Sequence, residues 1–88
     1  MLELINDIKK NCGYQNPVYT FTHGKCYEFA KKLQYIVGGE IIYLTKHEHA
    51  VLLYHGKLYD VTGNVTKKYI NEKFISEEEM IKRYKCFR

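Results

Sequence analysis

The sequence predicts an α+β fold in which one helix packs on a three-stranded antiparallel sheet, with a short helix towards each end of the chain. Residues 24–37 repeat apolar side chains at the spacing of an amphipathic helix, and two glycines follow it. Residues 40–61 contain three short runs rich in β-formers, separated by polar turns. Because 88 residues suffice for one modest core, we expect a single domain over residues 1–88.

The N-terminal part of the chain predicts a helix followed by a connection. Leu2, Ile5 and Ile8 lie at helical spacing, so we expect a helix over residues 2–11 that ends before Gly13. Residues 14–23 contain an Asn-Pro turn signal and a weak alternation that favours a short extended piece. We therefore expect this segment to connect two helices and to line the region where the second one begins.

The three expected strands cover residues 40–45, 49–54 and 57–61. The middle run, HAVLLY, is apolar on both faces, which is typical of a central strand. His55 and Gly56 form the expected hairpin turn between the second and third strands.

The C-terminal part ends in a second capped helix. Residues 65–75 fit either a turn or a short helix. Ser76 and Glu79 form a capping-box pattern, which predicts a helix over residues 77–85. Its expected inward side chains are Met80, Ile81 and Tyr84.

Charge, cysteine spacing and hydropathy disfavour several kinds of function for this chain. The net charge is +4 and the basic residues are scattered in short pairs, a pattern that does not favour nucleic-acid binding. Cys12, Cys26 and Cys86 are odd in number and widely spaced, which disfavours a disulfide framework. The sequence shows neither a signal peptide nor an apolar run of membrane-spanning length. We expect a cytoplasmic protein with no membrane partner.

Cys26, His49 and Asp60 are the candidate chemical groups. Cys26 falls in the first turn of the expected second helix, where free N–H groups and the helix dipole stabilise a thiolate. His49 opens an apolar strand, where it is either a satisfied core residue or a general base. His23 is the second choice as the partner of the cysteine. Cys26 taken alone also fits a small buried residue on the apolar stripe.

The hairpin allows the relation between His49 and Asp60 to be checked. A two-residue turn at His55-Gly56 places both on one face of the sheet as diagonal neighbours, about 7–8 Å apart at Cα. A three-residue turn would place them on opposite faces. Asp60 then has two open explanations: a fixed imidazole partner, or a cap on the turn that begins at Thr62.

These segments resemble the papain-like and transglutaminase-like cysteine hydrolase superfamily in their order: GKCYEFAKKL, then HAVLLY, then HGKLYDVTG. The resemblance implies a papain-like outline, with Cys26 as nucleophile, His49 as general base and acid, and Asp60 orienting the imidazole. It implies acyl transfer on a protein or peptide, by a peptidase, amidase or acyl transferase without a cofactor or a metal. The candidate substrate-binding or oxyanion residues are Gln15, His23, Gly24 and Tyr27.

Two other functions stay open. An inert binding module, such as a phage or mobile-element inhibitor, would capture a host protein or a small charged ligand with a tyrosine-rich surface. A zinc site formed by Cys26, His47 and His49 lacks an evident fourth ligand.

Overall fold

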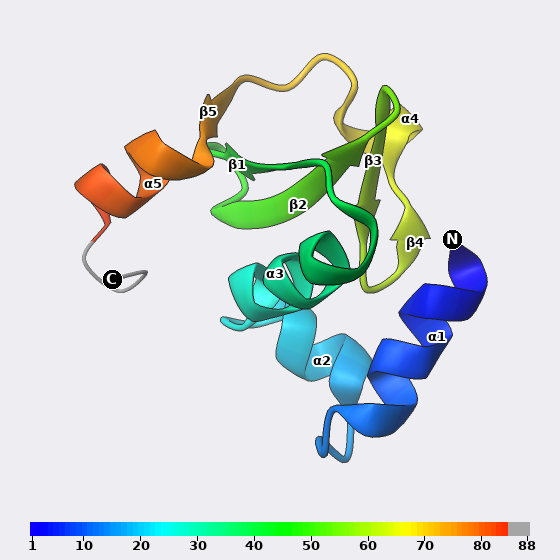
Figure 1. Ribbon diagram of the computed structural model, residues 1–88. Helices are drawn as coiled ribbons and strands as arrows, with labels where there is room; N and C mark the ends of the chain where they lie inside the picture. Colours follow the sequence, from blue (N-terminus) through cyan, green and yellow to red (C-terminus); the bar gives the residue numbers. More distant parts are fainter. Residues whose placement is uncertain (85–88) are drawn as a thin grey trace.

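The computed structural model describes residues 1–84 and has an α+β fold built on a five-stranded antiparallel sheet (Figure 1). The strand order is β4-β3-β2-β1-β5. The predicted α+β class is confirmed, whereas the predicted count of three strands is wrong. The strands are β1 Glu40–Leu44, β2 His49–Tyr54, β3 Lys57–Asp60, β4 Gly63–Asn64 and β5 Phe74–Ser76.

The two additional strands lie at the edges of the sheet. β4 has two residues and pairs with β3, and β5 has three residues and pairs with β1. Runs this short carry no readable alternation, so only their pairing partners identify them as strands. The segment 65–75, left open between a turn and a short helix, contains the four-residue helix α4 Thr66–Tyr69 and the beginning of β5.

Residues 14–23 were expected to form a connection with a short extended piece. This expectation is wrong, because the segment contains the helix α2 Pro17–Thr22. The Asn16 side chain accepts a hydrogen bond from the Tyr19 N–H, and Pro17 occupies the first helical position. Asn-Pro is therefore a helix start here rather than a turn. Local capping decides this segment, and the weak alternation over residues 18–22 does not form a strand.

The remaining helices lie close to their predicted positions. They are α1 Leu2–Asn11, α3 Cys26–Val37 and α5 Glu77–Arg83. Ser76 caps α5 by accepting a hydrogen bond from the Glu79 N–H, as the capping-box pattern predicts. The helix was predicted to continue to residue 85 but ends at Arg83, since Tyr84 has an extended backbone; residue 85 itself lies outside the described residues.

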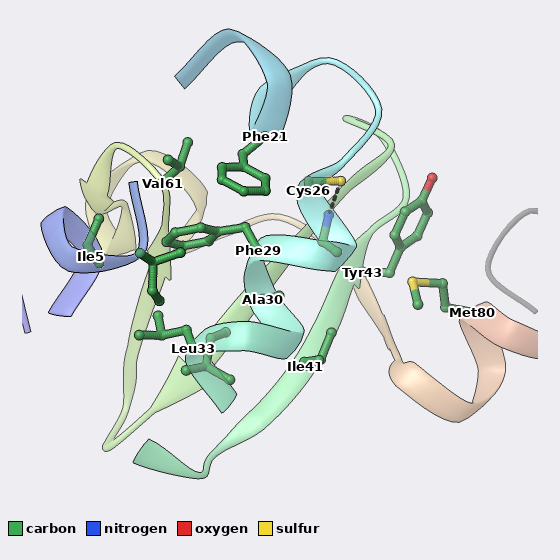
Figure 2. Packing of buried hydrophobic residues seen from close by; sticks show 13 residues of the cluster. Ile5, Phe21, Cys26, Phe29, Ala30, Leu33, Ile41, Tyr43, Val61 and Met80 are labelled. Carbon is green, nitrogen blue, oxygen red and sulfur yellow. Dashed lines mark hydrogen bonds between the residues drawn. The ribbon is translucent and has the colours of Figure 1, made fainter. Parts of the chain in front are cut away.

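The helix α3 packs across one face of the sheet, with α2 and α1 beside it (Figure 1). Its buried stripe consists of Cys26, Phe29, Ala30 and Leu33. Ile36, in the last turn of the helix, lies at the margin of this stripe and is 52% exposed. Figure 2 shows the aromatic and aliphatic side chains that fill this side of the sheet.

The hairpin between β2 and β3 has the predicted two-residue turn. Tyr54 pairs with Lys57 across it, and both His55 and Gly56 have positive φ, at 50° and 75°. Positive φ at both central residues is the type I′ geometry that matches the twist of paired strands. β2 is a central strand, as its apolar sequence predicts.

None of the helices in residues 1–84 combines the length and the apolar character that crossing a membrane requires.

Candidate active site

Cys26 is the first residue of α3 and is buried, with 7% of its surface exposed. The turn before it depends on Gly24, whose φ of 115° favours glycine. The Lys25 N–H donates to the Thr20 carbonyl at 3.2 Å, which ties the start of α3 to α2. The Ala50 N–H donates a hydrogen bond to Sγ of Cys26 at 3.3 Å, the dashed contact in Figure 2. The sulfur therefore rests against the beginning of β2.

His49 and Asp60 form a buried pair across β2 and β3. His49 Nε2 donates to Asp60 Oδ2 at 2.9 Å, and the two residues are 8% and 5% exposed. Their shared face follows from the two-residue hairpin turn, so this predicted relation is confirmed. With Nε2 engaged by the carboxylate, Nδ1 is the ring nitrogen left for the thiol. A hydrogen bond between His49 and Cys26 completes the chain of contacts.

The second carboxylate oxygen of Asp60 accepts hydrogen bonds from the turn that follows β3. Oδ1 accepts the Thr62 N–H at 2.7 Å and also the Thr62 hydroxyl. The two explanations left open by the sequence therefore both hold at once, because each oxygen serves one of them. Among the buried side chains of residues 1–84, no polar atom lacks a hydrogen-bond partner.

The three groups shift one another's proton affinity. Burial raises the pKa of the Cys26 thiol, but hydrogen bonds from His49 and the Ala50 N–H outweigh burial, and the net pKa lies below its usual value. Burial lowers the pKa of His49, but Asp60 and Cys26 together raise it to about 9. Burial likewise opposes ionisation of Asp60, yet His49 and Thr62 hold its pKa below its usual value. Each shift favours the ionised form of its group: the thiolate of Cys26, the imidazolium of His49 and the carboxylate of Asp60.

The cluster forms where the start of β2 meets the start of α3. Strand alternation puts His49 with Val51 and Asp60 with Leu58, on the sheet face that carries α4. Cys26 comes from the opposite face, so contact requires the histidine to occupy the first position of its strand. The Tyr69 ring of α4 packs near the imidazole, with centroids 6.0 Å apart.

A pocket of about 490 Å³ opens beside the thiol. Its lining includes Cys26, the candidate residues Gly24 and Tyr27, and Tyr43 of β1. Its charged lining residues are Lys25, Glu28, Lys31 and Glu48. Two of these are already engaged: Glu28 accepts the Tyr14 hydroxyl at 2.9 Å, and Lys31 pairs with Glu77 at 3.0 Å.

The other candidate residues lie elsewhere. Gln15 is exposed before α2, and it is not part of the pocket lining. His23 folds back on α2, where Nδ1 lies 2.9 Å from the Tyr19 carbonyl oxygen and the ring stacks on that of Tyr19. The structure thus brings together Cys26, His49, Asp60, Gly24 and Tyr27, and leaves Gln15 and His23 outside the pocket.

The ligand set considered for zinc is separated. His47 pairs with Glu72 at 3.3 Å, whereas His49 pairs with Asp60. Within residues 1–84, His, Cys, Asp and Glu side chains form no group of three or more that could hold a metal ion.

The contact of the Ala50 N–H with the Cys26 sulfur was not predicted, because it depends on tertiary packing and leaves no sequence signal. The contact of Thr62 with Asp60 was predicted as one of the two explanations for the aspartate, since Asp commonly accepts hydrogen bonds from the residue two positions later.

Fold and contacts together define an α+β protein with a buried cysteine–histidine–aspartate cluster beside a pocket. The chain belongs to the family of phage YunG-like proteins, whose model matches residues 1–86. No curated protein matches the chain. No solved structure matches it either.

Proposed function

We propose that this protein is a small papain-like cysteine hydrolase that performs acyl transfer on a protein or peptide, as a peptidase, amidase or acyl transferase. The observation that carries the proposal is the position of His49, which hydrogen-bonds the Cys26 thiol and donates to Asp60 at 2.9 Å. A buried histidine with a carboxylate on one side and a thiol on the other is the arrangement that activates a sulfur nucleophile.

In the proposed mechanism His49 holds the proton of Cys26, and the thiolate attacks the carbonyl carbon of an amide or thioester. The new C–S bond forms while the carbonyl electrons move to oxygen. As the tetrahedral intermediate collapses, the imidazolium gives its proton to the leaving amine or thiolate. Water or an amine then attacks the acyl-enzyme with His49 as base, which releases the thiol. Asp60 keeps the imidazole oriented throughout.

The oxyanion requires hydrogen-bond donors near the sulfur. The Cys26 N–H at the start of α3 is the donor we propose, because the first N–H groups of a helix have no carbonyl acceptor within the helix. Gly24 and Tyr27 border the pocket where the acyl group would lie. Gln15 lies outside this pocket, so we assign it no donor role in the proposed mechanism.

The papain-like outline is part of the same proposal. It is supported by a helix that carries cysteine at its start and packs on an antiparallel sheet that carries the histidine and the aspartate. The free thiols of Cys12 and Cys26 favour a reducing compartment, in keeping with a cytoplasmic location.

A binding module without turnover is the second candidate. It is favoured by the burial of Cys26 and by the placement of Gln15 and His23 away from the pocket. Of the candidate side chains, Tyr27 lines the pocket, and its hydroxyl donates to Glu77. The family description, which names phage proteins, is compatible with an inhibitor that captures a host protein.

The pH dependence of iodoacetamide alkylation distinguishes the two candidates. Mass spectrometry reads Cys12, Cys26 and Cys86 in one sample, so Cys12 serves as an internal control. The hydrolase proposal expects Cys26 to react selectively below the ordinary thiol pKa of about 8.5 and to lose this selectivity in His49→Ala. Reaction of Cys26 with the same pH dependence as Cys12 would overturn the proposal and favour the binding module.

A further inference from the structure

The turn after β3 contains two copies of one motif. Asp60-Val61-Thr62 and Asn64-Val65-Thr66 each place threonine two residues after an acidic or amide side chain. In both copies one side-chain oxygen accepts the threonine N–H and the threonine hydroxyl together. The two copies differ in one contact. In the first copy, the other carboxylate oxygen of Asp60 accepts a hydrogen bond from His49.

We propose that Thr62 is a positioning residue for the cysteine–histidine pair, holding the Asp60 carboxylate so that its other oxygen faces His49. The observation that supports this proposal is that the two carboxylate oxygens of Asp60 have different hydrogen-bond partners. Oδ1 receives both Thr62 donors, and Oδ2 receives His49 Nε2 at 2.9 Å. The proposal rests on the hydrolase function proposed above, since it concerns the same site.

Two donors on one oxygen restrict rotation of the carboxylate about its terminal bond, a torsion that is otherwise broad. Asp60 is 5% exposed, so water cannot replace a lost donor freely. Thr62 itself is exposed, which allows its side chain to be changed without opening the core. The titratable groups that face His49 are Asp60 from β3, Cys26 from α3 and Tyr69 from α4.

The test compares Thr62→Val with Thr62→Ser and Thr66→Val. Valine keeps the shape and the backbone N–H of Thr62 but removes its hydroxyl, and serine restores the hydroxyl. Thr66→Val removes the equivalent hydroxyl from Asn64, and it also removes the acceptor of the Leu58 N–H at 2.9 Å. It therefore perturbs the same turn at least as strongly without touching Asp60.

Two readouts are measured for each variant: the His49 pKa by NMR titration, and the pH at which alkylation of Cys26 rises. We expect Thr62→Val to lower the His49 pKa and to move the alkylation rise upward by about half a pH unit or more, about a threefold loss of rate at pH 6. Thr62→Ser and Thr66→Val should match the wild type in both readouts.

The outcomes separate the two proposals. If Thr62→Val leaves the His49 pKa unchanged or raises it, or if Thr66→Val lowers it equally, Thr62 does not position the pair. The NMR readout does not depend on a reactive thiol, so it decides this question even if Cys26 alkylates like Cys12. That alkylation result would overturn the hydrolase function instead.

Discussion

His49 and Asp60 are eleven residues apart in sequence, yet Nε2 of His49 lies 2.9 Å from Oδ2 of Asp60 at the end of neighbouring antiparallel strands. One is the first residue of β2 and the other is the last residue of β3. Their contact depends on the two-residue turn at His55 and Gly56, because one more turn residue would move Asp60 to the other face. The hairpin thus delivers an oriented imidazole to the sulfur of Cys26.

Replacing Asp60 with asparagine should make Cys26 less reactive near pH 6. The amide carries no charge, so the pKa of His49 should fall from about 9 and the thiolate should lose its counter-charge. We expect a roughly tenfold lower alkylation rate at pH 6, the scale of a hydrogen bond to a charged group. Glu72→Gln is the matched control, since it removes a carboxylate from His47 instead. An equal loss in that control would show a general charge effect.

The pH dependence of stability should differ between the wild type and Cys26→Ser. His49 has a raised pKa, so its contribution is complete below the unfolded value of 6.5 and declines as pH rises through about 9. Cys26 has a lowered pKa, so its contribution grows as pH rises towards the unfolded value of 9.0. The two slopes oppose each other in the wild type, and serine removes the second one.

We therefore expect urea unfolding to show a smaller decline in free energy between pH 6.5 and 9 for the wild type than for Cys26→Ser. Parallel declines in the two proteins would show that Cys26 does not ionise with His49. Below pH 3.8 both proteins should lose stability, because the lowered pKa of Asp60 stabilises the fold only while its carboxylate is charged.

Gly39 and Gly38 should respond differently to alanine. Both have positive φ, at 89° and 83°, so both variants carry backbone strain of about 1–2 kcal/mol. A Cβ at Gly39 would also lie 2.6 Å from the Leu53 carbonyl oxygen in β2, whereas nothing lies within 4 Å of one at Gly38. We expect Gly39→Ala to lower the free energy of unfolding by at least about 1 kcal/mol more than Gly38→Ala. Equal losses of stability in urea unfolding would mean that the backbone before β1 moves away from the Leu53 carbonyl at little cost.

The tie between α3 and α5 should depend more on Tyr27 than on Lys31. The Tyr27 hydroxyl donates to Glu77 Oε2 at 2.6 Å, and burial together with this carboxylate raises the pKa of Tyr27 to about 12. Lys31 pairs with the same oxygen at 3.0 Å, but its side chain is 51% exposed. Exposed ion pairs contribute little, whereas a partly buried hydrogen bond to a charged group contributes more.

We expect Tyr27→Phe to lower the free energy of unfolding by about 1–2 kcal/mol and Lys31→Ala by less than about 0.5 kcal/mol. Thermal unfolding resolves this contrast, since about 1 kcal/mol corresponds to a Tm shift of roughly 4–8 °C in a domain of this size. The reverse order would assign the tie to charge rather than to the tyrosine hydroxyl.

Local patterns in the sequence determined much of the architecture. The apolar repeat of α3, the capping box of α5 and the hairpin at His55-Gly56 are each decided within a few residues, so each could be predicted. The relation of His49 to Asp60 belongs to this group, because strand alternation and turn length are local properties. The helix start at Asn16-Pro17 was also local, but Asn-Pro serves turns and helix starts alike.

The tertiary structure alone decided the rest. The edge strands β4 and β5 are too short for any periodicity and exist through pairing with β3 and β1. The contact of Cys26 with His49 joins the start of α3 to the start of β2. The Ala50 N–H donates to the sulfur only because α3 packs against this part of the sheet. Contacts between distant segments arise from the packing of the whole core, which no short stretch of sequence encodes by itself.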